Sequence, residues 1–369
     1  MLLALILLTL QDARALVRAG VVENDRAKIV EGVAAYYHVS EHNPPPHLIA
    51  DAYVRLATAR DNDELARALL GVRFFEEAAL IAAPDSDVAR YAAMLQRMRA
   101  LTQNARQREP AALRRALGRE LATMWPKLSF DAAVAQMEKE YGGVLQVHGR
   151  DALIAHKILD KALLVDQYGH KGRVRFVVLD GVVSNGEGDR IGGTGNSKAI
   201  YQVRPPFADG PLWMWDRVQA KTPATQVGQR LQLQYLEQVL AATQTRDAFI
   251  ARIERDAFHY IMVLHEGRHA IDDALHVNLQ TWELEYRAKL SQVALTETAA
   301  RVSAADIFAG PKDDTPHGRA NAKLVRDLTR WMKTNAPHLT IDQFDQLTDE
   351  QIRGAFRSLD PLAKGKRPE

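Results

Sequence analysis

The N-terminal part of the chain repeats apolar residues with the three-to-four-residue period of amphipathic helices. Ala, Leu and Arg dominate from residue 27 to about residue 122, and the pattern is interrupted at the proline run 44–46, at Pro84 and at Pro110. Because proline breaks the interior of a helix, these positions separate one element from the next. The pattern predicts helices at residues 26–39, 47–59, 63–82, 85–104 and 110–124.

The middle of the chain changes from helical to strand-like patterning. Residues 130–141 and 151–168 are predicted as two further helices, separated by a pair of glycines. Residues 174–183 are apolar and β-branched, and residues 199–203 have the same character. The pattern therefore predicts two strands there, which belong to a small sheet.

A glycine-rich segment, residues 185–198, connects the two predicted strands. A phosphate-binding loop needs Gly-Lys-Ser/Thr at the start of a helix. Here Ser197 precedes Lys198, and a strand follows instead of a helix. The segment therefore predicts a hairpin loop and gives no support for nucleotide binding.

The most regular apolar periodicity runs from residue 249 to residue 273 and predicts one long helix. Residues 257–264 within it are nearly all apolar, which is typical of a helix that enters the interior of a protein. A second helix is predicted to follow, with Thr281 as its N-cap. Two more helices are predicted at residues 321–334 and 341–358.

Length and composition limit the class of protein. The chain has 369 residues, enough for a large core, and its net charge of +2 gives no argument for a nucleic-acid partner. It contains no Cys, which excludes disulfides, iron–sulfur clusters and a thiol nucleophile. We expect a predominantly α fold with a small β-sheet (α+β) and two domains, a helical one at residues 21–145 and a second one at residues 146–369.

The N-terminal segment has the features of a targeting sequence. Residues 1–10 are apolar, but a membrane span needs about 20 such residues. The run fits the hydrophobic region of a signal peptide with Ala-Arg-Ala at residues 13–15 as the cleavage site. It also fits an ordinary N-terminal helix within residues 1–20. We expect export, to the periplasm or outside the cell, with a cytoplasmic protein as the alternative; membrane association is expected only through this segment if it is retained.

Metal-binding chemistry appears near the end of the long predicted helix, in His265-Glu266-Gly267-Arg268-His269. Residues four apart on a helix lie on one face, so both imidazoles can point at a single ion. Neutral imidazole nitrogens suit Zn²⁺, and Glu266 is placed to take a proton from a water molecule. Gly267 costs a helix interior roughly 1 kcal/mol relative to Ala, so we expect a packing reason for it. The pentad predicts one Zn²⁺ per chain.

A zinc site that performs chemistry needs a third protein ligand and an open coordination position. The next predicted helix offers Glu283 and Glu285, and Glu297 follows farther along. Glu283 falls in the first turn, where the helix dipole favours an acidic side chain whatever its role. We therefore predict Glu285 as the third ligand, with Glu283 and Glu297 as alternatives.

The pentad followed by Glu285-Tyr286-Arg287-Ala288 resembles the gluzincin branch of zinc metallopeptidases. In that family the third ligand is a Glu on the next helix, often in the sequence Glu-x-x-Ala-Asp. Lys289 stands where the Asp would be, so the supporting role of that Asp has no counterpart at this position. The resemblance covers about residues 246–300 and is specific for zinc binding rather than for a substrate.

The resemblance implies a zincin-like catalytic domain at residues 146–369, preceded by the all-helical region. It implies that the predicted strands hold an extended peptide, and that the substrate is a peptide or a protein. It also implies the roles of the site residues, with Glu266 as general base and three zinc ligands: His265, His269 and Glu285.

Hydrolysis of a peptide bond also needs a hydrogen-bond donor for the negative charge that develops on the carbonyl oxygen. His317 lies in the sequence Asp-Thr-Pro-His-Gly-Arg, in a predicted loop that can fold over the cleft. We predict His317 as this second catalytic residue beside Glu266. The alternatives are His259, Tyr260, Tyr286 and Arg287.

Two acidic residues, Asp272 and Asp273, follow the pentad on roughly the ligand face. One interpretation is that either carboxylate accepts a hydrogen bond from a zinc-bound imidazole, which such ligands usually need. The other is that these residues pair with Arg268 or Arg287. The sequence leaves both interpretations open.

Three functions are consistent with these features. We favour a zinc-dependent peptidase. One alternative is a non-catalytic helical interaction protein with a structural or vestigial metal site, against which Glu266 argues, because a purely structural site has no use for a general base. The other is a zinc hydrolase acting on a non-peptide amide or a cell-wall component.

Overall fold

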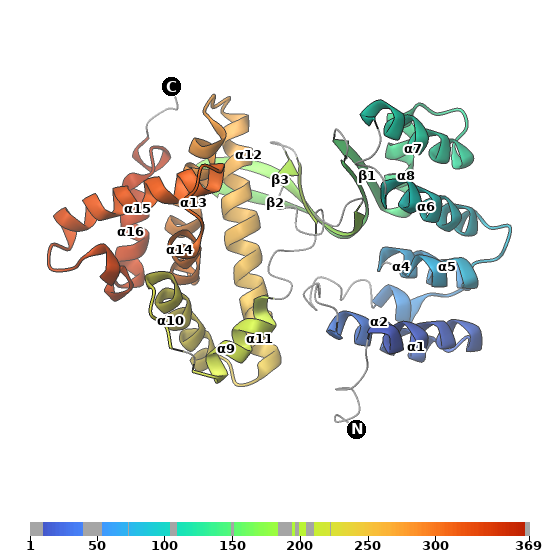
Figure 1. Cartoon of the computed structure of the whole chain (residues 1–369), viewed down its shortest axis with the longest axis horizontal. Helices are drawn as coiled ribbons and strands as arrows, with labels where there is room; N and C mark the ends of the chain where they lie inside the picture. Colours follow the sequence, from blue (N-terminus) through green and yellow to red (C-terminus); the bar gives the residue numbers. More distant parts are fainter. Residues whose placement is uncertain are drawn as a thin grey trace. The chain divides into compact units, whose positions relative to one another are not determined.

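The computed structural model describes residues 10–39, 54–72, 74–103, 109–148, 151–183, 194–195, 199–203, 210–221 and 223–365. These residues form helices and one small sheet with the strand order β1-β2-β3-β5-β4 (Figure 1). The predicted α+β class is therefore confirmed. The chain divides into two compact units: the first comprises Met1–Asp160, Val177–Gly192 and Tyr201–Asp209, and the second comprises Lys161–Phe176, Gly193–Ile200 and Gly210–Glu369.

The helices of the first unit lie close to their predicted positions. Those predicted at 26–39 and 110–124 have the predicted bounds, and of the helix predicted at 47–59 the structure describes residues 54–59, of which 54–58 are helical. The labelled helices of this unit are α1 (Leu10–Glu23), α2 (Arg26–Val39), α4 (Asn62–Gly71), α5 (Phe75–Ile81), α6 (Asp87–Gln103), α7 (Pro110–Met124) and α8 (Phe130–Tyr141).

The single helix predicted at residues 63–82 is wrong, since the structure has α4 and α5 there. Val72 and Phe74 are both fully buried, and side chains two residues apart share one side only on extended backbone. Gly71, just before them, is a poor helix former. The Val72 N–H accordingly turns back to the carbonyls of the last turn of α4, with φ at −119°.

The helix predicted at residues 151–168 is also wrong, because this segment is strand β2 (Asp151–Gln167). It pairs antiparallel with β1 (Gly143–His148), a strand that the pattern did not predict. A strand covered on both faces is a continuous apolar run, which periodicity cannot distinguish from a buried helix. The N-terminal part of β2 is such a run, with every residue at most 6% exposed: Ala152, Leu153, Ile154 and Ala155.

The remaining strands agree with the prediction. Residues 174–183 and 199–203 belong to β3 (His170–Val183) and β5 (Ala199–Val203), and the short β4 is Thr194–Gly195. The turn between β2 and β3 is Tyr168-Gly169, with φ at +55° and +89°. Two consecutive positive φ angles give the two-residue turn that matches the twist of a hairpin. Apart from β4, the predicted loop at 185–198 lies outside the described residues.

A buried histidine marks the core of the first unit. His156 on β2 is 2% exposed, and its Nε2 lies 3.0 Å from the hydroxyl of Tyr91 on α6. The Tyr91 ring stacks on Tyr141 of α8 with the ring centroids 3.8 Å apart. Burial lowers the pKa of His156 to about 4, so this imidazole is neutral at physiological pH. The interaction ties the helices to the sheet in this unit.

The second unit contains the pentad and a large helical core. Five helices build that core: α10 (Val227–Ala242), α13 (Thr281–Ala294), α14 (Ala300–Ala309), α15 (Pro316–Asn335) and α16 (Asp349–Leu359). The unit also has α9 (Gly210–Gln219) and two 3-10 helices, η5 (Ile341–Gln346) and η6 (Leu362–Lys364). The helix predicted at 321–334 is confirmed within α15, whereas the one predicted at 341–358 is divided between η5 and α16.

The pentad lies on a continuous helical rod that we call the pentad helix, residues 246–274 (Figure 1). Its parts are α11 (Arg246–Ala257), η4 (Phe258–Glu266) and α12 (Gly267–Ala274). The predicted helix at 249–273 is confirmed, but its middle is a π-helix of nine residues, which the sequence did not indicate. The first two pentad residues therefore close the π segment, and the last three open α12.

The pentad helix packs on the part of the sheet that belongs to the same unit. Val165 of β2 and Phe176 of β3 share an apolar cluster with Met262 and Ile271 of the pentad helix. A Cβ atom on Gly267 would lie 2.9 Å from a methyl group of Val165. The expected packing reason for this glycine is therefore confirmed: it lets β2 approach the helix within the pentad itself.

The first residue of the N-terminal segment that the structure describes is Leu10, where α1 begins. Residues 13–15, the predicted cleavage site, lie inside α1, and Ala13 is fully buried. Residues 1–9 lie outside the described residues, so the signal peptide stays a prediction. In the part of the chain that the structure covers, no helix has both the length and the apolar character of a membrane span.

Replacing Gly267 with Ala is expected to destabilise the second unit. The new methyl group would collide with Val165, whose β-branched side chain has little rotamer freedom to move away. Overpacking of this kind costs about 1–3 kcal/mol. Gly354→Ala in α16 is the control, because no atom lies within 4 Å of its Cβ position, and Ala there should stabilise the helix by up to about 1 kcal/mol. Urea unfolding of both variants measures the difference; equal stability would contradict the close approach.

Candidate metal centre

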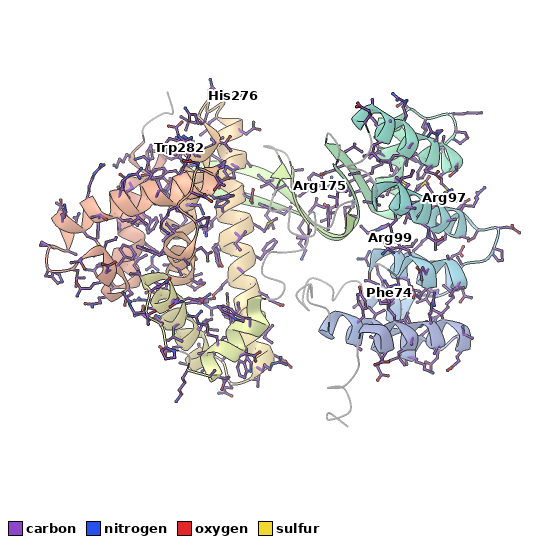
Figure 2. All side chains as sticks on the ribbon, viewed as in Figure 1. Phe74, Arg97, Arg99, Arg175, His276 and Trp282 are labelled. Atoms are coloured by element: carbon purple, nitrogen blue, oxygen red, sulfur yellow. The ribbon has the colours of Figure 1, made fainter. Side chains whose placement is uncertain are left out.

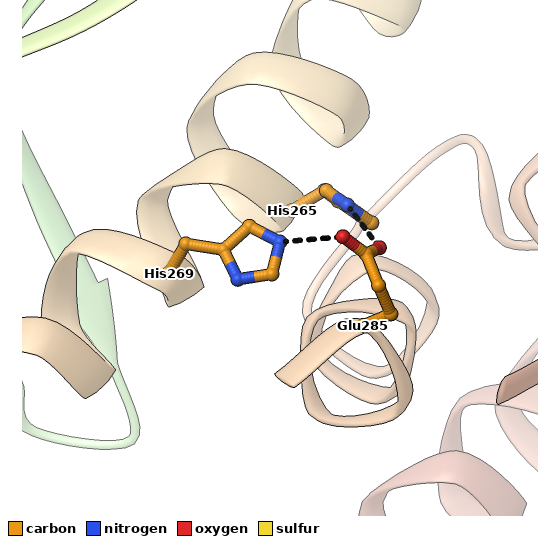
Figure 3. A group of neighbouring side chains, drawn as sticks. All are labelled: His265, His269 and Glu285. Carbon is orange, nitrogen blue, oxygen red and sulfur yellow. Dashed lines mark ion pairs between the residues drawn. The ribbon is translucent and has the colours of Figure 1, made fainter. Parts of the chain in front are cut away.

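Three predicted ligands meet at one point of the second unit. His265 and His269 project from the pentad helix towards Glu285 on α13 (Figure 3). His265 Nε2 lies 3.3 Å from Glu285 Oε2, and His269 Nε2 lies 3.5 Å from Glu285 Oε1. One ligand atom from each residue lies within 4.8 Å of the others. The three side chains can therefore contact a single ion.

The π-helix shapes the backbone that carries the first histidine. His265 and Glu266 are its last two residues, and the Gly267 N–H reaches back to the carbonyl of Met262, five residues earlier. The hydrogen bonds of a π segment span five residues instead of the four of an α-helix, and such segments are frequent at functional sites. The Leu264 carbonyl inside it accepts a hydrogen bond of 3.1 Å from the fully buried side chain of Gln167. A strand residue thus supports the irregular backbone at the site.

A side chain that the sequence did not indicate orients His265. Its Nδ1 lies 2.8 Å from Oε1 of Gln292, seven residues after Glu285 on α13. An amide oxygen only accepts hydrogen bonds, so Nδ1 donates, and Nε2 of the neutral ring keeps its lone pair. This lone pair faces Glu285 Oε2. Gln292 therefore holds His265 in the tautomer that a metal ligand needs.

Glu285 is a buried carboxylate whose surroundings favour a cation. Its Oε2 is 3.3 Å from His265 and 3.0 Å from His317, yet among the described residues no donor is directed at it as a hydrogen bond. A buried acceptor without a donor is costly, and an acceptor nitrogen opposite it adds repulsion. A cation between the two atoms removes both penalties. Two imidazole nitrogens and one carboxylate oxygen are a ligand set that zinc takes.

The electrostatics agree with this ligand set. Burial alone would raise the pKa of Glu285, but positive charge on the neighbouring imidazoles of His265, His269 and His317 would hold this pKa well below its usual range, and a bound cation would act in the same direction. The carboxyl group is therefore ionised, as a ligand must be. Burial lowers the pKa of His269, but the neighbouring Glu285 raises it by more, so the net shift of the His269 pKa is upward.

The two alternative third ligands lie elsewhere. Glu283 is part of the N-terminal cap of α13, where its carboxylate accepts a hydrogen bond of 3.0 Å from the Gln280 N–H. The N-cap is Gln280, so the prediction of Thr281 as the cap is wrong by one residue. Glu297 is exposed and lies beyond the C-terminal end of α13. Among the described residues, only Glu285 joins the two histidines in a cluster of three.

The predicted general base, Glu266, lies within the same site. It follows His265 directly and is half-buried at the end of the π segment. Within the described part of the chain its carboxylate makes no hydrogen bond, although its charge raises the pKa of His269. A carboxylate in this position is available to accept a proton from a water molecule.

His317 also comes to the site, but not from a loop. It lies in the first turn of α15, which Thr315 caps through a hydrogen bond to the Gly318 N–H, so the predicted loop is wrong at this point. His317 Nδ1 lies 3.0 Å from Glu285 Oε2, and its ring is nearly parallel to that of His265. With 57% of its side chain exposed, it can meet a molecule that enters from solvent.

The alternatives to His317 are placed less favourably. The Tyr286 hydroxyl donates to Asp327 at 2.8 Å, and Arg287 is buried against Asp272 with two hydrogen bonds. Tyr260 is 5% exposed in the core. His259 lies in the π segment, six residues before His265, and its pKa is lowered by burial. Of the five candidates, the structure brings His317 into contact with a predicted ligand.

The fourth residue of the pentad, Arg268, forms a buried ion network. Its side chain is fully buried and donates to Asp272 at 3.0 Å and to Asp360 at 2.9 Å and 3.2 Å. Ser291 on α13 contacts both Arg268 and Asp360. Asp272 also accepts from Arg287, so the interpretation in which this acid pairs with arginines describes the structure. Asp360 had no recognisable signal in the sequence.

Comparisons with other proteins add nothing to this picture. No protein-family profile, no characterised protein and no solved structure matches the chain. The geometry of the site is therefore the basis of the proposals below.

Replacing Arg268 with Met is expected to destabilise the second unit by about 3–5 kcal/mol, because it leaves Asp360 buried without its cation. Arg330→Met is the matched control. It removes a guanidinium that is 76% exposed and pairs with Asp327, and such pairs contribute under about 1 kcal/mol. Urea unfolding followed by tryptophan fluorescence compares the two. A cost as small for Arg268 as for Arg330 would show that the network does not hold the site together.

Proposed function

We propose that the protein is a zinc-dependent peptidase. The observation that carries the proposal is the orientation of the ligands: Gln292 fixes the proton of His265 on Nδ1, so that its Nε2 lone pair and a buried Glu285 oxygen face each other. A purely structural hydrogen-bond network would place a proton between these atoms. His265, His269 and Glu285 would hold the ion, and the part of the chain around them would be a zincin-like catalytic domain.

The remaining side chains fit the needs of amide hydrolysis. Bound Zn²⁺ supplies a Lewis acid, which lowers the pKa of water and polarises a carbonyl group. Glu266 accepts the proton of the attacking water and returns it to the leaving amine. His317, exposed at the start of α15, donates a hydrogen bond to the carbonyl oxygen as negative charge develops there. The proposed substrate is a peptide or a protein, and export of the protein is proposed on its N-terminal segment.

Zinc content is expected to depend on Glu285 and not on Glu283. Elemental mass spectrometry of the purified wild type and of Glu283→Ala should find about one zinc per chain, whereas Glu285→Ala should have lost it, since two imidazoles alone bind zinc weakly. The two substituted residues lie two positions apart on the same helix, so their comparison separates ligation from a change in helix stability. A wild type that stays metal-free after zinc addition would favour the non-catalytic interaction protein.

Glu266→Gln is expected to keep zinc and to lose peptide hydrolysis by a factor of about 10²–10⁴, the usual contribution of a general base. Cleavage of denatured casein and of a peptide library, followed by mass spectrometry, measures the loss. The zinc content of the variant shows that the site is intact. Hydrolysis of glycan-linked amides by the wild type without cleavage of any peptide would instead identify a zinc hydrolase of another class.

A further inference from the structure

Helix α15 carries an excess of positive charge beside the proposed metal centre. It begins next to His317 and contains one acidic residue, Asp327. Its basic residues follow one another at spacings of three or four: Arg319, Lys323, Arg326, Arg330 and Lys333. A helix with this composition attracts anionic groups to its surroundings.

Two of these five charges are compensated within the protein, whereas Arg319, the basic residue nearest to His317, is not. Lys323 and Arg330 both pair with Asp327, at 2.7 Å and 3.2 Å. Among the described residues, Arg319 has no carboxylate partner. Its guanidinium carbon instead lies 5.2 Å from the centre of the Trp282 ring. A stacked guanidinium keeps its N–H groups available for a carboxylate at its edge.

The position of Trp282 places this free cation close to the ligands. Trp282, which is labelled in Figure 2, lies on α13. It precedes Glu285 by three residues, and this spacing puts the two side chains about one turn apart on the same face of the helix. A hydrogen bond of 2.8 Å from its Nε1 to Gln280 holds the indole in place. On the other side, Arg319 follows His317 by two residues. The guanidinium group of Arg319 therefore packs against the Trp282 indole, whose position is fixed about one helical turn from Glu285.

We propose that Arg319, supported by Trp282, binds a carboxylate of the substrate. This inference rests on the proposed peptidase function and specifies its substrate class as peptides that carry a carboxylate close to the scissile bond. One helical turn separates the neighbouring Cβ atoms by roughly 5–6 Å, and an extended peptide advances about 3.3 Å per residue. With the further 5.2 Å from the Trp282 ring to the guanidinium carbon, these spacings place the carboxylate within about three residues of the bond that is cleaved. It belongs either to an acidic side chain or to the C-terminus of the peptide.

Cleavage of matched peptides tests the inference. Alanine-rich peptides capped at both ends carry one Glu, or one Gln, at successive positions, and a third series has Gln and a free C-terminus. The zinc-loaded wild type should cleave one of the carboxylate series with at least a tenfold higher kcat/KM than the capped Gln series. The preferred series identifies the source of the carboxylate.

The variants assign the preference to one residue. Arg319→Gln should abolish the preference and keep the zinc content, because Arg319 is exposed and does not contact the ligands. Arg326→Gln is the matched control, since it removes the same charge from the same helix two turns farther from His317. A wild type without preference, or an Arg319→Gln variant that retains it, would overturn the inference.

A binding measurement separates this inference from the peptidase proposal. Calorimetry with the zinc-loaded Glu266→Gln protein should show the preferred carboxylate peptide binding at least tenfold more tightly than its capped Gln counterpart, and the further change Arg319→Gln should remove the difference. If this difference is found while the wild type cleaves no peptide, the peptidase proposal fails and the carboxylate site stands. If peptides are cleaved but bind equally, the carboxylate site fails. If neither is observed, both fail.

Discussion

The complete burial of one guanidinium group governs the structure around the candidate metal centre. Arg268 lies between the two histidines of the pentad, and a buried cation is tolerated only when carboxylates surround it. Asp272 comes from the same helix, but Asp360 must be brought from beyond α16, and Ser291 and Arg287 join the network from α13. Compensation of the Arg268 charge thus requires the pentad helix, α13 and the residue that follows α16 to lie in contact.

The charge of the site differs from what the resemblance to gluzincins implies. A neutral carboxamide, Gln292, supports His265 where a carboxylate is common, and Lys289 stands one turn after Glu285. Lys289 is 8% exposed, and burial lowers its pKa. Glu285 is therefore left as the main negative charge of the ligand set, beside the cation of Arg319. A ligand set with a single negative charge and a neighbouring Arg319 cation both favour negatively charged groups on a ligand that binds at this site.

Local chemistry was predictable from the sequence, whereas long-range partnerships were not. The pentad and Glu285 could be found because helical spacing and ligand chemistry act over a few residues, and the helices at 26–39 and 110–124 are delimited by prolines and polar residues. Strand β2 was mistaken for a helix because its N-terminal part is covered on both faces, and the π segment has no pattern of its own. Gln292 and Asp360 join the site only through the tertiary fold, so no spacing rule reveals them.

The salt bridge between Arg268 and Asp360 also affects the order in which parts of the protein fold. Its partners are 92 residues apart in the sequence, so closing the loop between them comes late in folding and at an entropic cost. Until Asp360 has been synthesised and has docked, the guanidinium keeps its water and the pentad helix cannot settle into the interior. During synthesis on the ribosome, a chain whose candidate metal ligands have already emerged therefore still lacks the complete ion network around them. The distance along the chain therefore delays the assembly of the candidate ligands relative to their synthesis.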